Sequence, residues 1–169
     1  MRWPWGSRTV HGVPVKARSE RSADEVMAQV NALELRMIKY KLMDAEHGKG
    51  WSIQKAETVE RKYKRFLYLS WKHRGKSMVP TEDIDEFWHY HILDTQRYPA
   101  DCMKLFGYVI HHFPYLGIRG AEDAKALRDA FAETCSIYER ELGEPYVEST
   151  TQPLRYAACG NEADVEPQD

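Results

Sequence analysis

The stretch "FWHYHILDTQRYPADC", residues 87–102, decides the fold because it joins two helical patterns through a short break. Phe87, Trp88 and His91 recur at the spacing of one helical face, which predicts a helix that begins after an N-cap at Thr81. The break falls at about residues 95–98, and Pro99 then suits the first turn of a further helix. This stretch therefore predicts helical rather than sheet architecture.

The rest of the chain repeats the helical pattern. A capping box of Ser22 and Glu25 starts a first helix that ends at the "HGKG" of residues 47–50. Its apolar residues form one stripe and a second, off-stripe set, which indicates packing on more than one side. Further helices are expected at about 52–73, 82–94, 99–110 and 121–142, and no run alternates as a strand does. We predict an all-α fold, a compact single-domain bundle of about five helices.

Length and composition limit the class of protein. The 169 residues suit one domain, and the formal net charge of -2 argues against a nucleic-acid binder. No apolar run is long enough for a membrane span, and the basic start has no apolar segment of a secretory signal. We expect a flexible basic arm at 1–21, a helical domain at 22–146, an acidic mobile tail at 147–169 and a cytoplasmic location. The three cysteines, at positions 102, 135 and 159, form no CxxC pair, so neither a disulfide framework nor a thiolate zinc site is expected.

Four of the seven histidines fall within residues 89–112, at His89, His91, His111 and His112. Side chains two positions apart on a helix point in directions that differ by about 200°. His89 and His91 therefore cannot both face one metal from a regular helix. Asp85 stands one turn before His89, where its carboxylate would orient the imidazole. If the third and fourth helices fold back as an antiparallel hairpin, His91 comes level with Asp101. A single site holding all four histidines then requires the fourth helix to break, for example at Gly107, or the third helix to unwind near Asp94.

Two interpretations of this cluster remain open. In the first, His91 is a buried histidine bonded to Asp101, and His111 and His112 cap the end of a helix. In the second, two or three histidines and Asp101 or Asp94 bind a divalent ion. Imidazole and carboxylate ligands without thiolate fit Fe(II), Mn or catalytic Zn.

Cys102 and Tyr98 each have two interpretations as well. Cys102 has the position of a small buried hydrophobe, and the alternative is a nucleophilic pair with His91. Tyr98 is either a core aromatic residue or a hydrogen-bond donor into a catalytic site.

The segment "VPTEDIDEFWHYHILDTQRYPADCMKLFG" resembles the signature of the glycine-rich domain-containing-protein-like family, a D-x-x-W-H-x-H block followed by Y-x-x-D-C and a glycine. The matching positions here are Asp85, Trp88, His89, His91, Tyr98, Asp101, Cys102 and Gly107. The resemblance covers about residues 50–145 and implies that His89, His91, Tyr98 and Asp101 act as a group. The family is largely uncharacterised, so the resemblance implies no reaction.

Two functions compete on this basis. The first is a small metalloenzyme acting on a small molecule or peptide, with Fe or Zn (Mn as a further option) held by His91, His111 or His112 and a carboxylate. His89 is then a ligand or a general base, and iron-dependent oxidation is favoured over zinc-dependent hydrolysis. The second is a non-catalytic helical binding module that docks through its basic arm, with Trp3 and Trp5, and its acidic tail. A metal-free small-molecule pocket ranks third.

Overall fold

The structure, a computed structural model, describes residues 9–10, 13–14 and 21–147. Six helices and one two-stranded antiparallel ladder are present in these residues; the strands are β1 (Thr9–Val10) and β2 (Val13–Pro14), with Thr9 opposite Pro14 and Val10 opposite Val13. The all-α prediction is confirmed. Apart from the two short strands, Arg21 and Val147, the predicted arm and tail lie outside the described residues.

The chain divides into two compact units. The first comprises the residues up to Arg74 together with Asp83–His111, and the second comprises Gly75–Glu82 and the residues from His112 onward. Each unit has its own buried side chains.

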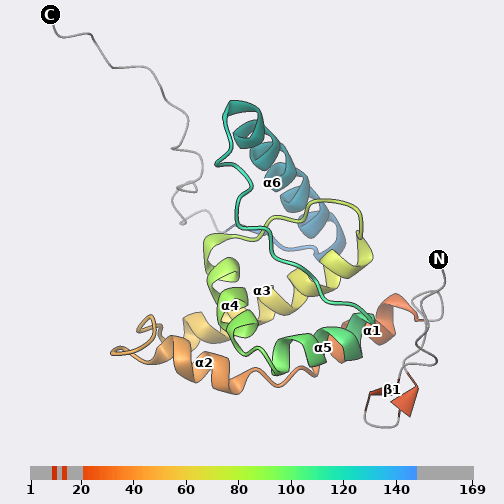
Figure 1. Cartoon of the computed structure of the whole chain (residues 1–169), viewed down its shortest axis with the longest axis vertical. Coiled ribbons are helices and arrows are strands. Elements are labelled where there is room, and N and C mark those ends of the chain that lie inside the picture. Colours follow the sequence, from red (N-terminus) through yellow and green to blue (C-terminus); the bar gives the residue numbers. More distant parts are fainter. Residues whose placement is uncertain (1–8, 11–12, 15–20, 148–169) are drawn as a thin grey trace, which may run out of the picture. The chain divides into compact units, whose positions relative to one another are not determined.

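Helix α3 (Ile53–Lys72) is the central element of the first unit, as Figure 1 shows. It starts where Ser52 accepts a hydrogen bond from the Lys55 amide, and it buries eight side chains along its length. Helices α1 (Ala23–Asn31) and α2 (Arg36–Met43) both pack on α3, and α1 also packs on α5 (Arg97–Phe106). The positions of the α3 ends agree with the prediction.

The first predicted helix is two helices, so the described residues contain six helices instead of about five. The capping box of Ser22 and Glu25 is present, but α1 ends at Asn31 and α2 begins at Arg36. Leu33 and Leu35, in the connection, are both buried. A straight helix would carry these two leucines on different faces, whereas a break lets both enter the core. Of the off-stripe apolar residues, Ile38 and Leu42 are buried residues of the second helix, and Leu35 directly precedes it.

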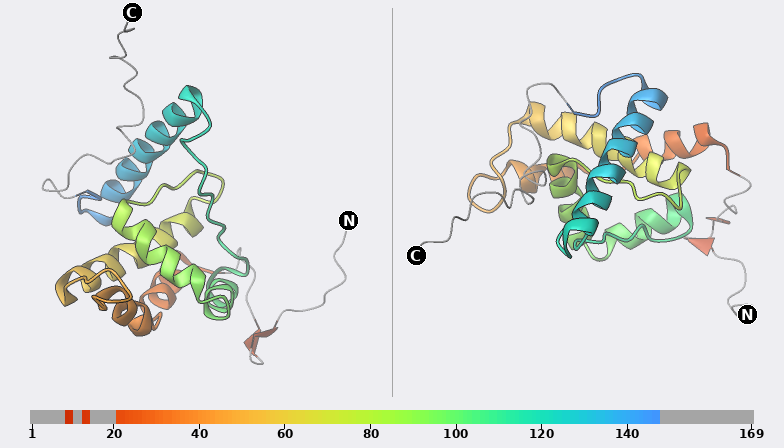
Figure 2. Two further views of the ribbon diagram at one scale, coloured as in Figure 1. Left: turned by 60° about the vertical axis from the view of Figure 1, so that its left-hand side comes forward. Right: turned by 90° about the horizontal axis from the view of Figure 1, so that it is seen from above.

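Helices α4 (Glu82–Leu93) and α5 do not form the antiparallel hairpin considered above. After the turn at residues 94–96, α5 runs at a large angle to α4, which both views of Figure 2 show as well as Figure 1. Helix α5 also ends earlier than predicted, at Phe106, because Gly107 adopts the left-handed conformation with φ of 77°. Residues 108–112 consequently lie beyond the helix.

The second unit is built on α6 (Ala121–Leu142), whose bounds match the prediction. Thr134 accepts a hydrogen bond from the Val79 amide at 3.0 Å, and the Tyr146 hydroxyl donates to the Val79 carbonyl, also at 3.0 Å. The rings of Tyr138 and Tyr146 lie 4.6 Å apart between centroids. These contacts attach the 75–82 segment and the end of the described chain to one helix.

Charged side chains occur along both long helices, α3 and α6. Within the described part of the chain, no helix is long and apolar enough to cross a membrane.

Candidate metal centre

Helix α4 presents its two histidines to opposite environments. His91 is 1% exposed, whereas the His89 side chain is 44% exposed. This is the outcome expected for two residues separated by about 200° on a regular helix. The two imidazoles therefore belong to separate groups.

His91 is held through both of its ring nitrogens. Its Nδ1 lies 2.8 Å from the Tyr63 hydroxyl, and its Nε2 lies 3.2 Å from Oδ2 of Asp101. An ionised carboxylate can only accept, so Nε2–H donates to Asp101 and Nδ1 accepts from the tyrosine. In this arrangement neither nitrogen has a lone pair available for a metal ion. The His91–Asp101 contact agrees with the first interpretation of the cluster.

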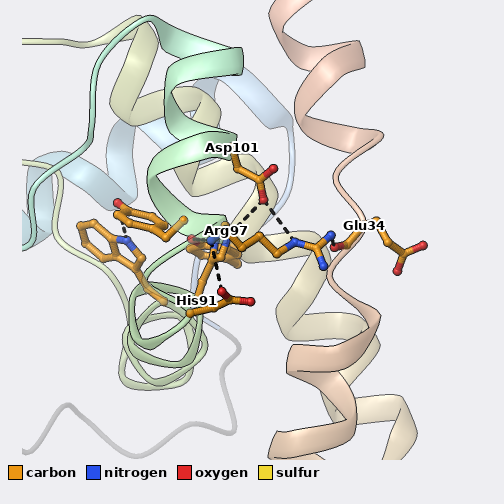
Figure 3. A network of polar contacts seen from close by, with 8 residues as sticks. Glu34, His91, Arg97 and Asp101 are labelled. Carbon is orange, nitrogen blue, oxygen red and sulfur yellow. Dashed lines mark hydrogen bonds and ion pairs between the residues drawn. The ribbon is translucent and has the colours of Figure 1, made fainter. Parts of the chain in front are cut away.

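Asp101 is also bound from the other side. The Nε atom of Arg97 lies 3.5 Å from the same Asp101 oxygen, and the Arg97 guanidinium donates to the backbone carbonyl of Glu34. Figure 3 shows Asp101 between His91 and Arg97, with Arg97 extending to Glu34. This network joins α4 and α5 to the connection between α1 and α2, which is a structural task.

Tyr63 completes the network from α3 and was not predicted. Its ring is fully buried, and burial raises the pKa of the hydroxyl well above its ordinary value. The hydroxyl therefore stays protonated and remains a donor to His91. In the sequence, Tyr63 is only one member of an apolar face, although a buried tyrosine hydroxyl generally needs a partner. This need for a hydrogen-bond partner was the only sign in the sequence that Tyr63 could join a polar network.

A second buried network surrounds Tyr98. The Trp88 indole Nε1–H donates to the Tyr98 hydroxyl at 2.9 Å, and the Tyr98 hydroxyl donates to the Ile110 carbonyl. Cys102 contacts the Tyr98 hydroxyl and the Ile110 backbone, and burial raises the pKa of its thiol. A thiol with a raised pKa is a poor nucleophile. Cys102 is thus in the environment of a small buried hydrophobe.

The accessible face of α4 carries a His/Asp group that could hold a metal ion, and Asp85 and His89 belong to it. The Oδ2 of Asp85 lies 3.8 Å from the Nδ1 of His89, at the predicted i, i+4 spacing. Asp85 is mostly covered, with 21% of its side chain exposed. Sequence reasoning assigned Asp85 only the task of orienting His89, yet its carboxylate is itself a candidate ligand. His91 and Asp101 are not members of this group.

His111 and His112 do not cap a helix, because α5 ends before them at Phe106. His111 is exposed and is the last residue of the first unit. His112 is half-buried and is the first residue of the second unit. The helix does break at Gly107, but His91 is bonded to Tyr63 and Asp101 and is not in the group with His89, so the four histidines do not share one site.

Comparison with known proteins agrees with the resemblance noted in the sequence. The chain is 38% identical over 94 residues to glycine-rich domain-containing protein 1 of Arabidopsis thaliana, covering 53% of this chain and 11% of that protein. It is 37% identical over 94 residues to glycine-rich domain-containing protein 2 of the same plant, covering 53% of this chain and 12% of that one. The chain thus spans only about a tenth of the length of these relatives.

No solved structure matches the chain. The family model described as UCP032817-like matches residues 28–145. The match begins within α1 of the first unit and extends past the end of α6 in the second unit. The chain therefore belongs to the UCP032817-like family.

Proposed function

We propose that this protein binds a divalent transition metal ion through Asp85, His89 and His112. The observation that carries the proposal is the approach of a carboxylate oxygen and an imidazole nitrogen to 3.8 Å on the accessible face of α4. Neighbouring ligand atoms around one ion, with bonds of about 2.1 Å, lie about 3.0–3.4 Å apart. The 3.8 Å between the Asp85 and His89 ligand atoms is slightly longer than this range.

His112 is the third ligand in this proposal. It is joined by one peptide bond to His111, the last residue of the first unit, and it is half-buried. Because the chain has left the helix at Gly107, the backbone at residues 108–112 is not bound to helical geometry. His111 is the alternative donor from the same segment.

The ligand chemistry favours Fe(II) or Zn, with Mn as a further option. Two imidazoles and one carboxylate form the set that non-haem iron and catalytic zinc sites use, whereas structural zinc sites are richer in thiolate. Such a set leaves coordination positions for water or substrate, and a metal ion there would supply Lewis acidity or redox chemistry. The proposed activity is that of a small metalloenzyme, with oxidation favoured over hydrolysis.

A second candidate is a non-catalytic helical binding module. The observation that favours it is the saturation of His91, whose ring nitrogens bond to Tyr63 and Asp101. If every polar group of the cluster has such a structural partner, no metal is needed. The two candidates differ in one measurable property, which is the effect of metal ions on stability.

The test is thermal unfolding of untagged, chelator-treated protein with Fe(II), Zn, Mn or Cu. A metal that binds only the folded state stabilises it by about 2.7 kcal/mol at 100 times Kd. For a chain of this size that raises Tm by roughly 5 °C or more. We expect this rise in the wild type and its loss in His89→Ala, Asp85→Asn and His112→Ala.

The chain offers a matched control in Asp44 and His47. Their Oδ2 and Nδ1 atoms lie 3.6 Å apart on an exposed turn, so this pair has the same chemistry without membership of the group. His47→Ala should keep the full metal-dependent rise. A wild-type Tm that no metal changes, or an equal rise in His89→Ala, would contradict the proposal.

A further inference from the structure

We propose that Tyr98 is a positioning residue for the metal centre, because it fixes the backbone that leads into His111 and His112. This inference rests on the proposed function above. It assigns Tyr98 no contact with the metal or with substrate.

The anchor consists of two hydrogen bonds in series. Trp88 donates through its indole nitrogen to the Tyr98 hydroxyl at 2.9 Å, and that hydroxyl donates to the carbonyl of Ile110. Trp88 is the residue directly before His89 on α4. The backbone of Ile110 is therefore tied to the helical turn that carries His89.

Chain length then limits where the histidines can go. A residue adds at most about 3.6 Å to the reach of an extended chain, so His112 lies within about 7 Å of the Ile110 Cα atom. Without the anchor, the segment between the end of α5 at Phe106 and the start of α6 at Ala121 contains no helix or strand that would hold it. The hydrogen bond from Tyr98 to Ile110 holds this segment in place where no helix or strand does so.

Tyr98 is suited to holding the Ile110 backbone in place and is unsuited to proton transfer. Its hydroxyl accepts one hydrogen bond and donates another, and its side chain is buried, with 4% of the residue exposed. Burial also raises its pKa, so the hydroxyl stays protonated at physiological pH. The thiol of Cys102 contacts the same hydroxyl and the Ile110 backbone, which reinforces the anchor.

Tyr63 provides the matched control. It too is a buried tyrosine, its ring is edge-on to His91 at 5.9 Å, and the Tyr98 ring is edge-on to His91 at 5.0 Å. The Tyr63 hydroxyl, however, bonds to His91 and not to the segment before His112. Tyr98→Phe and Tyr63→Phe therefore remove the same atom from two different networks.

The experiment measures the Kd of Co(II) and Zn for the full chain by competition with a chromophoric chelator. Loss of a group that orients a ligand typically weakens metal binding by about 10- to 100-fold. We expect Tyr98→Phe to raise Kd by about tenfold or more and Tyr63→Phe to change it less than about twofold. Trp88→Phe, which keeps the Tyr98–Ile110 bond, should have an intermediate effect and serves in place of Tyr98→Phe if that variant does not fold.

A second measurement requires no metal. Amide hydrogen exchange at residues 108–112 of the metal-free protein should be faster in Tyr98→Phe than in the wild type and unchanged in Tyr63→Phe. Equal exchange and equal Kd in all three proteins overturn the inference while leaving the proposed function intact. Faster exchange in Tyr98→Phe together with no metal binding by the wild type refutes the proposed function instead, and with it the link from Tyr98 to a metal.

Discussion

The Tyr63 hydroxyl lies 2.8 Å from Nδ1 of His91, deep in the first unit and 28 positions away in the chain. This contact and the bond from Nε2 to Asp101 engage the whole imidazole. His91 is therefore a fixed part of the core, and the proposed metal chemistry belongs to His89 on the other face of α4.

His91→Ala should destabilise the fold without changing metal affinity. The substitution leaves a cavity and removes a partner from the buried Tyr63 hydroxyl and from the partly exposed Asp101 carboxylate, so the free energy of unfolding should fall by about 3 kcal/mol. Tyr63→Phe removes a single hydrogen bond and should cost about 1 kcal/mol. Urea denaturation gives both values, and a His91→Ala protein that is as stable as the wild type would contradict the assignment.

Glu60 should make the stability of the protein depend on pH below about 4.5, the ordinary pKa of a glutamate side chain. Burial raises its pKa, but hydrogen bonds from Lys39 and Lys64, at 2.7 and 2.8 Å, outweigh burial and lower it. Because the folded-state pKa is depressed, the ion pairs stabilise the protein above the unfolded-state pKa, and this stability is lost as pH falls through the folded-state pKa.

The corresponding variant is Glu60→Gln. It should be less stable than the wild type by about 1 kcal/mol or less near pH 7, since the groups are partly exposed. The difference should shrink as pH falls below 4.5. Unfolding free energies of both proteins from pH 7 to pH 3 provide the comparison, and a gap that widens in acid would refute the argument.

Gly48→Ala should damage the loop after α2. A Cβ atom at Gly48 would lie 1.8 Å from the Lys41 carbonyl oxygen and 2.7 Å from that of Asp44. Both atoms belong to the backbone, so the loop must move, at a cost of about 1–3 kcal/mol. Gly50→Ala is the control, because its Cβ would meet only ordinary contacts at 3.7 Å or more, although its φ of 62° adds strain of about 1 kcal/mol. A thermal melt in which Gly50→Ala is the less stable variant would contradict this reading.

Cys102 should resist thiol reagents in the folded protein. Its residue is 2% exposed, and burial raises the pKa of the thiol, so little thiolate is present at pH 7. Mass-spectrometric mapping after brief alkylation should find Cys102 modified only once denaturant is added. Rapid modification of Cys102 in native protein would revive the nucleophile interpretation.

Local patterns were sufficient to predict most of the helices. The Ser52 cap, the apolar face of α3 and the glycine after α6 act over a few residues, so their sequence signals are complete in themselves. The Asp85–His89 pair was predictable for the same reason, since helical spacing alone brings them together. The break between α1 and α2 was missed because burial of Leu33 and Leu35 overrides helical continuity.

By itself, the sequence determined the all-α class, the separation of His89 from His91 and the acidic neighbour of His89, Asp85. Only the tertiary structure decided which histidine is saturated, because the hydroxyl of Tyr63 reaches His91 from a different helix. It also decided the path after Gly107, where the Tyr98 hydroxyl accepts a hydrogen bond from Trp88 and donates one to the Ile110 carbonyl. Contacts within a helix follow from the backbone geometry of that helix, whereas contacts between segments depend on how their side chains pack together, and no local spacing encodes that packing.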